Sequence, residues 1–142
     1  MDLAAPTDQV FPVVSDLDSY QHWLGFISRC EPANAESGDP GPAWTVTLRA
    51  RLGPFARSKQ LRMVRSECSP SSLVKFERRE VDGREHSPWA LESTLDATTA
   101  TQTQLKMVLS YDGPLWSPIL EKALDQYADE AKANLRRLVE SD

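Results

Sequence analysis

The sequence has few of the residues that cross-link small proteins or build metal sites. Its 142 residues include two cysteines, Cys30 and Cys68, and two histidines. The cysteines stand alone, without CxxC spacing or a neighbouring cluster of histidines, so the pattern indicates neither a disulfide framework nor a metal site. We predict two reduced thiols, no metal and no cofactor.

Long apolar runs and an excess of positive charge are also lacking. The longest apolar runs are only a few residues, whereas a membrane-spanning helix needs about 20, and the N-terminus lacks the basic-then-apolar order of a signal peptide. The formal net charge of -5 gives no general attraction to phosphate backbones or anionic lipid. We therefore expect a cytoplasmic protein with no integral membrane segment and no nucleic-acid partner.

Catalytic signatures are scarce as well. The chain contains no serine nucleophile elbow, HExxH motif or phosphate-binding loop. The only catalytic candidate is His22 in SDLDSYQHWLGF, since Asp16 or Asp18 could orient its imidazole as a general base. Alternatively, the aspartates and Ser19 form a turn between two short helices, and the aromatic residues that follow are an apolar cover.

The sequence does contain a regular spacing of apolar residues, and this spacing changes twice along a chain that has the length of one domain. Val10, Val13 and Val14 recur at helical spacing, with Thr7 as a possible N-cap. Because Pro12 lacks the N–H that a helix interior needs, we expect this helix to be kinked or to begin late. A second short helix is expected over Tyr20 to Leu24.

After the turn-rich stretch SGDPGP the period becomes two. In AWTVTLRARL, Trp44, Val46 and Leu48 fall on one face and threonines and arginines on the other, which predicts a half-buried antiparallel strand. Further strands are predicted near residues 56–67, 73–79, 87–95 and 102–111, and an edge strand near residues 29–35.

The last segment returns to helical period. Apolar residues recur at intervals of three and four from residue 120 to residue 138, and Ser117-Pro118 is a suitable helix start. About 23 residues would span roughly 34 Å. We predict an α+β fold in which a curved antiparallel sheet of six to seven strands wraps around this long helix.

Three segments carry a resemblance to a known superfamily: APTDQVFPVVSDLDSYQHWL, RARLGPFARSKQLRMVR and LSYDGPLWSPILEKAL. With the order of elements, they make the chain resemble the START-like, or Bet v 1-like, superfamily of polyketide cyclases and lipid-transport proteins, from about Ala4 to Glu140. The resemblance implies a helix-grip fold with a cavity between sheet and closing helix, open beneath the N-terminal helices.

One departure from the superfamily concerns its long first strand, because only Met1, Asp2 and Leu3 precede the Ala-Pro pair. The strand is either a stub or incomplete in this sequence. An unpaired sheet edge would follow, through which two copies could form a homodimer.

The residues predicted to bind a ligand are large or adaptable side chains on faces that turn toward the closing helix. The same set could instead fill a solid core. The predicted residues are Trp23, Phe26, Trp44, Leu48, Met63, Phe76, Trp89, Leu91, Met107, Leu109, Leu124, Tyr127, Arg62 and Arg78.

The two arginines are included because each could hold a carboxylate or phenolate by a bidentate contact. Arg78 shares the parity of Val74 and Phe76. Arg62 shares the parity of Val64, whereas its neighbours Leu61 and Met63 favour the other face, so the orientation of Arg62 stays open. The alternative is a basic, exposed sheet face.

Three functions fit this pattern. The first is binding or transport of a small hydrophobic molecule, such as a lipid, quinone or polyketide. The second is an aromatase or cyclase of the kind known in the superfamily, with His22, Tyr127 and Arg62 as its polar groups. The third is a protein-interaction module like the co-chaperone branch of the fold.

Overall fold

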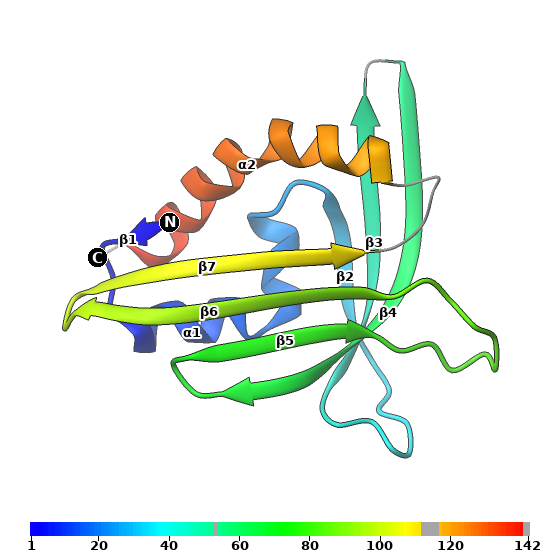
Figure 1. The fold of residues 1–142 in the computed structure, drawn as a ribbon, viewed down its shortest axis with the longest axis horizontal. Helices are drawn as coiled ribbons and strands as arrows, with labels where there is room; N and C mark the ends of the chain where they lie inside the picture. The colour runs from blue at the N-terminus through cyan, green and yellow to red at the C-terminus, as the bar shows by residue number, and fades with distance from the viewer. Residues whose placement is uncertain (53, 112–116, 141–142) are drawn as a thin grey trace.

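A computed structural model describes residues 1–52, 54–111 and 117–140. Seven strands form one antiparallel sheet in the order β1-β7-β6-β5-β4-β3-β2 (Figure 1), and a C-terminal helix completes the helix-grip arrangement. The elements are β1 (Asp2–Leu3), α1 (Thr7–Val14), the 3-10 helix η1 (Leu17–His22), β2 (Ile27–Ala33), β3 (Ala43–Leu52), β4 (Phe55–Ser69), β5 (Leu73–Arg78), β6 (Trp89–Thr99), β7 (Gln102–Tyr111) and α2 (Ser117–Val139).

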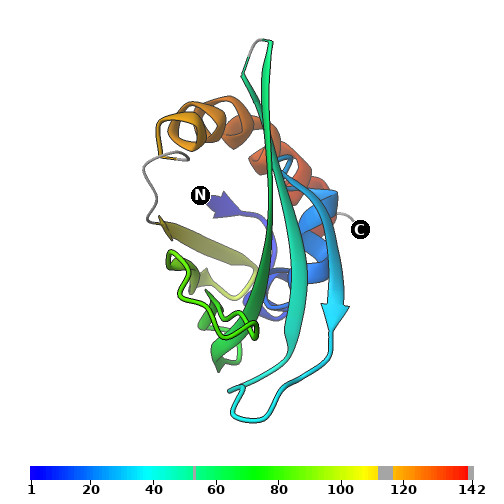
Figure 2. The same ribbon diagram turned by 90° about the vertical axis from the view of Figure 1, so that its right-hand side faces the viewer.

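The sheet is sharply bent. Figure 2 shows β2, β3 and most of β4 running in one direction, with β5 to β7 crossing them. The long strand β4 pairs with β3 along its first part and with β5 along its last, and its register with β5 shifts between Arg65 and Glu67. A bulge of this kind bends a strand and increases its twist, so β4 joins both directions and makes the sheet concave.

The apolar faces of the strands line this concave side. In β3, Trp44, Val46 and Leu48 are all buried, as their alternation predicts. Trp44 lies opposite Met63 in β4, and Val46 lies opposite Leu61. These cross-strand pairs place four large side chains in one layer that must be covered from above.

The N-terminal helices cover one part of the concave face. Tyr20 in η1 is completely buried, with its ring centroid 4.6 Å from that of Trp23 and 5.9 Å from that of Phe76. Its hydroxyl donates a hydrogen bond to the carbonyl oxygen of Val14 at 2.7 Å. Tyr20 therefore ties η1 to α1 while packing on the sheet, which makes it part of the solid core.

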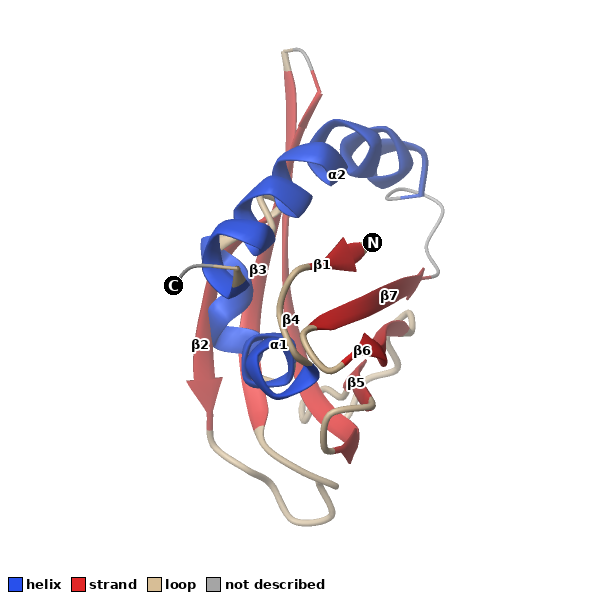
Figure 3. Ribbon diagram, turned by 90° about the vertical axis from the view of Figure 1, so that its left-hand side faces the viewer, coloured by secondary structure: helices blue, strands red, loops and turns tan. Residues whose placement is uncertain are grey.

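Helix α2 covers another part of the face (Figure 3). Ala131, Leu135 and Val139 are buried along its second half. The end of the helix is tied to the start of the chain, because the Glu140 carboxylate accepts a hydrogen bond from the Ala4 amide. None of the described helical segments is long and apolar enough to span a bilayer.

The expectations for local structure need several corrections. The N-cap of α1 is Pro6, with no side-chain cap, so Thr7 is the first helical residue; α1 continues through Pro12, a solvent-exposed position. The second short helix is a 3-10 helix that begins at Leu17. The edge strand β2 begins at Ile27, and β1 is a two-residue stub paired with β7.

We predict that Tyr20→Phe destabilises the protein by about 1–3 kcal/mol, because it leaves the buried Val14 carbonyl without its hydrogen-bond donor. Urea denaturation monitored by tryptophan fluorescence measures the change. Tyr127→Phe is the matched control, since the Tyr127 hydroxyl has no hydrogen-bond partner among the described residues. Equal effects of the two substitutions would contradict this assignment.

Candidate ligand-binding cavity

A cavity of about 640 Å³ lies between α2, strands β6 and β7, and the segment that follows η1. Its inner wall is apolar, and most of its members are buried. The inner wall consists of Met1, Trp23, Leu24, Phe26, Leu91, Leu105, Met107, Leu109, Tyr127, Ala131 and Leu135. Such a volume is in the range of small-molecule sites.

The cavity opens at the outer edge of β7. Its lining continues from the inner wall to Thr94, Asp96, Gln104 and Lys106 on β6 and β7, and to exposed Lys132 on α2. In β6 and β7, the even-numbered residues point away from the concave face that carries Leu91 and Leu109. The lining therefore includes residues from both faces of the sheet and extends around its outer edge. The polar rim therefore marks the way to solvent.

Phe26 and Tyr127 close the wall of the cavity nearest α2. Their ring centroids are 6.4 Å apart. Tyr127 also lies over Gly25: a Cβ atom at this glycine would be 2.8 Å from Cδ1 of the tyrosine and 3.1 Å from Cε1. The absence of a side chain at residue 25 lets the helix approach the loop this closely.

A second space of about 30 Å³ lies deeper between the sheet and Leu17 of η1. Leu48, Met63 and Trp89 line it, and it shares Phe26, Leu91 and Leu109 with the larger cavity. Its volume is about the volume that one water molecule occupies in liquid water. The interior is thus hollow toward β7 and nearly filled toward β3.

The structure divides the predicted ligand residues among three places. Trp23, Phe26, Leu91, Met107, Leu109 and Tyr127 line the large cavity, and Leu48, Met63 and Trp89 line the small space. Trp44 and Phe76 pack edge to face in the core, with centroids 5.6 Å apart. The side chain of Leu124 lies outside the described part of the molecule.

Arg62 lies on the other face of the sheet, opposite Thr45. Its guanidinium binds the Asp39 carboxylate at 2.7 Å and donates to the carbonyl oxygens of Asn34 and Arg79. Both charged side chains are almost fully buried, 9% and 2% exposed. Arg62 therefore fixes the loop that precedes β3, and it does not line the cavity.

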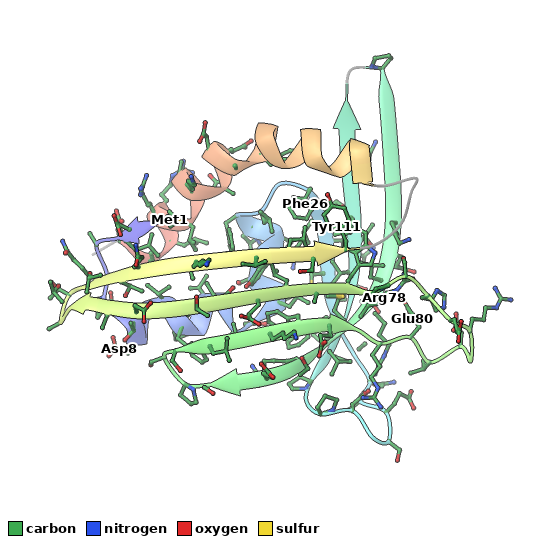
Figure 4. The ribbon with its side chains drawn as sticks, viewed as in Figure 1. Met1, Asp8, Phe26, Arg78, Glu80 and Tyr111 are labelled. Carbon is green, nitrogen blue, oxygen red and sulfur yellow. The ribbon has the colours of Figure 1, made fainter. Side chains whose placement is uncertain are left out.

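Arg78 lies on the concave face, opposite Met63. Its guanidinium contacts the Glu80 carboxylate at 2.7 Å, the Ser87 carbonyl oxygen and Nδ1 of His86. Figure 4 places Arg78 and Glu80 toward one end of the sheet and Met1 at the other. Arg78 consequently joins the loop before β6 to β5, and it is absent from the cavity lining.

The remaining chemical candidates also lie away from the cavity. His22 is exposed at the end of η1, and Asp16 accepts a hydrogen bond from the Asp18 amide, as a turn residue does. Burial raises the pKa of the Cys30 thiol to about 12, which keeps it protonated and unreactive. Among the described residues, no group of His, Cys, Asp and Glu side chains is arranged to hold a metal ion.

Several lining residues were not selected from the sequence. Leu105 shares the parity of Met107, and Ala131 and Leu135 belong to the apolar stripe of the closing helix, so their faces were predictable. Their place at the cavity was not, because periodicity does not show where the helix and the sheet separate. Met1 enters the wall through pairing with Leu105.

The chain belongs to the family described as polyketide cyclase / dehydrase and lipid transport, whose model matches residues 1–140. This is the superfamily that the sequence resembles. A comparison with curated proteins finds none that matches.

Solved structures with the same fold cover nearly the whole chain. A Chromobacterium violaceum protein is 16% identical, with a TM-score of 0.67 and coverage of 100% of this chain and 96% of that one. A START superfamily protein from Mycobacterium smegmatis is 17% identical, with a TM-score of 0.67 and coverage of 99% and 93%. The Zhui aromatase/cyclase from Streptomyces sp. R1128 is 17% identical, with a TM-score of 0.60 and coverage of 97% and 89%.

We predict that Gly25→Ala forces the Tyr127 ring to move and destabilises the protein by about 1–3 kcal/mol, as overpacking does. A double-mutant cycle with Tyr127→Ala, followed by urea denaturation, isolates the contact. The cost of the alanine at residue 25 should fall when the ring is removed. An unchanged cost would contradict the close approach.

We predict that Asp39→Asn destabilises the protein at neutral pH and that the difference from wild type shrinks in acid. The Arg62 guanidinium and the Glu36 amide lower the pKa of the Asp39 carboxyl below its usual 3.8. A lowered folded-state pKa contributes stability above the unfolded-state value and loses it as the pH falls through the folded-state value.

The measurement is the free energy of unfolding as a function of pH, from neutral to below 3.8. Asp82→Asn is the control, because the pKa of Asp82 is also lowered, by the Arg84 amide and by His86, but its side chain is 47% exposed. Solvent screens such a group. A larger effect at Asp82 than at Asp39 would contradict the role of the buried pair.

Proposed function

We propose that this protein binds a small hydrophobic molecule, such as a lipid, a quinone or a polyketide, between its sheet and α2. The observation that carries the proposal is the 640 Å³ cavity with an apolar inner wall. Burying a ligand there contributes roughly 25 cal/mol for each Å² of apolar surface removed from water. Affinity of this origin needs no activated side chain.

The positions of the ionisable groups favour binding over turnover. Among the described lining residues, Asp96, Lys106 and Lys132 lie on the exposed rim, and the Tyr127 phenol is the one ionisable side chain of the inner wall. Cyclase-type chemistry would therefore depend on this phenol. The family description and the similarity in fold to an aromatase/cyclase are compatible with it, but no proton acceptor beside the phenol among the described residues supports it.

The proposed setting is the cytoplasm, as expected from composition. Cys30 and Cys68 are both free, one buried and one exposed. Unpaired cysteines are typical of proteins kept in a reducing compartment.

We predict that freshly purified protein carries a hydrophobic small molecule in native mass spectrometry, and that Ala131→Trp removes it. Ala131 is 7% exposed and lines the cavity, so an indole there occupies the ligand's space. Affinity for an added fatty acid or quinone should fall by about tenfold or more, that is by about 1.4 kcal/mol.

Ala133→Trp is the matched control. It places the same side chain on the same helix at an exposed residue that is not part of the cavity lining. It should leave both the bound mass and the titrated affinity unchanged. Equal binding by the folded Ala131→Trp protein and the wild type would overturn the proposed site.

A further inference from the structure

One lysine points toward the apolar concave face of the sheet. Lys59 in β4 alternates in step with Leu61 and Met63, which are both buried on that face. It lies opposite Leu48 of β3, and both Leu48 and Met63 line the small space. The Lys59 side chain is partly buried, so its ammonium lies at the border of the apolar interior.

The Lys59 ammonium lies over the aromatic pair where β6 begins and β7 ends. Its Nζ atom is 6.0 Å from the ring centroid of Trp89, which stacks on Tyr111 with the ring centroids 5.3 Å apart. Figure 4 places Tyr111 and Arg78 toward the same end of the sheet. A ring face attracts a cation, but it does not supply the negative charge of a counter-ion.

Within the described part of the chain, no carboxylate forms an ion pair with Lys59. The nearby Glu80 carboxylate binds the Arg78 guanidinium at 2.7 Å and accepts a hydrogen bond from the Arg62 amide. Burial lowers the pKa of Lys59, and the charge of Arg78 lowers it further, against a smaller opposite effect of Glu80. An anion placed beside Lys59 would therefore be stabilised.

The small space lies between Lys59 and the large cavity. Leu48 and Trp89, the neighbours of Lys59, both line it, and it shares three wall residues with the large cavity. Met63 lines it as well, and an unbranched thioether side chain adapts to different shapes. A ligand whose apolar part fills the large cavity can therefore extend one end through the small space to the Lys59 ammonium.

Building on the proposed binding function, we propose that the ligand is a hydrophobic acid whose carboxylate binds the Lys59 ammonium while its apolar part lies in the large cavity. The carboxylate supplies the negative charge that this end of the concave face lacks. A charge-assisted hydrogen bond of this kind is stronger than one between neutral groups, and partial exclusion of water strengthens it further. A neutral ligand would leave the ammonium without a counter-ion.

Two probes with the same apolar chain test the assignment. Dodecanoate is charged at neutral pH, whereas dodecanol is not. Lys59→Gln should weaken dodecanoate binding by about tenfold, because it removes the counter-ion of the carboxylate, and it should leave dodecanol binding unchanged. Lys59→Arg keeps the positive charge and should keep most of the affinity for the acid. Isothermal titration of each folded variant with each probe gives the comparison.

Lys75→Gln is the matched control. Lys75 lies between the buried residues Val74 and Phe76 of β5, so it points to the other face of the sheet, where its ammonium is 3.6 Å from the Glu77 carboxylate. Its loss should change neither affinity. Equal dodecanoate binding by wild type and Lys59→Gln, with dodecanol also bound, would overturn the acid site and leave the cavity function intact. A wild type that binds neither probe would contradict the cavity function, and this proposal with it.

Lysine NMR locates the acid group directly. In protein whose lysines carry isotope-labelled methyl groups, dodecanoate should shift the Lys59 resonance, which is identified by its loss in Lys59→Gln. The acid should also raise the pKa of Lys59, because a bound anion favours the charged form. Dodecanol should not raise this pKa. Shifts confined to Lys106 and Lys132 would place the carboxylate at the rim and overturn the assignment.

Discussion

The bent sheet has one apolar concave face, and that face must be covered. No single element is large enough to do so, and the chain uses two covers from its opposite ends. The N-terminal helices pack into the part of the face around Phe76, while α2 packs against β3 and α1 and faces β6 and β7 across the cavity. The Glu140 contact to the Ala4 amide and the Asn134 contact to the Trp23 carbonyl hold the two covers together. The cavity is the volume that both leave uncovered.

Much of this fold is readable from the sequence, because a half-buried strand and an amphipathic helix each have a distinct period. The alternation in β3 specified both its residues and its buried face. The seven-stranded antiparallel sheet and the closing helix follow from the same kind of pattern. The N-terminal segment was less readable, since α1 begins without a side-chain cap and accommodates Pro12 near its end.

The site was only partly readable, for a different reason. The alternation of residues along a strand shows that Phe76 and Met107 both face inward. It does not show that Phe76 packs against Trp44 and Tyr20, whereas Met107 lines the cavity. Arg62 is a sharper case. Its partner Asp39 lies 23 residues away in a loop, and no local pattern indicates that two charges so far apart will neutralise each other.

The division of the concave face into a solid part and a hollow part separates two demands on the sequence. Residues such as Val74 and Phe76 are completely buried among neighbours, so a change in side-chain volume there lowers the stability of the fold. Met107 and Leu109 line the cavity, where a change of side-chain size alters the shape of the cavity at a small cost to folding. For the proposed binding function, substitutions on β7 can therefore change which ligand fits while the fold remains the same.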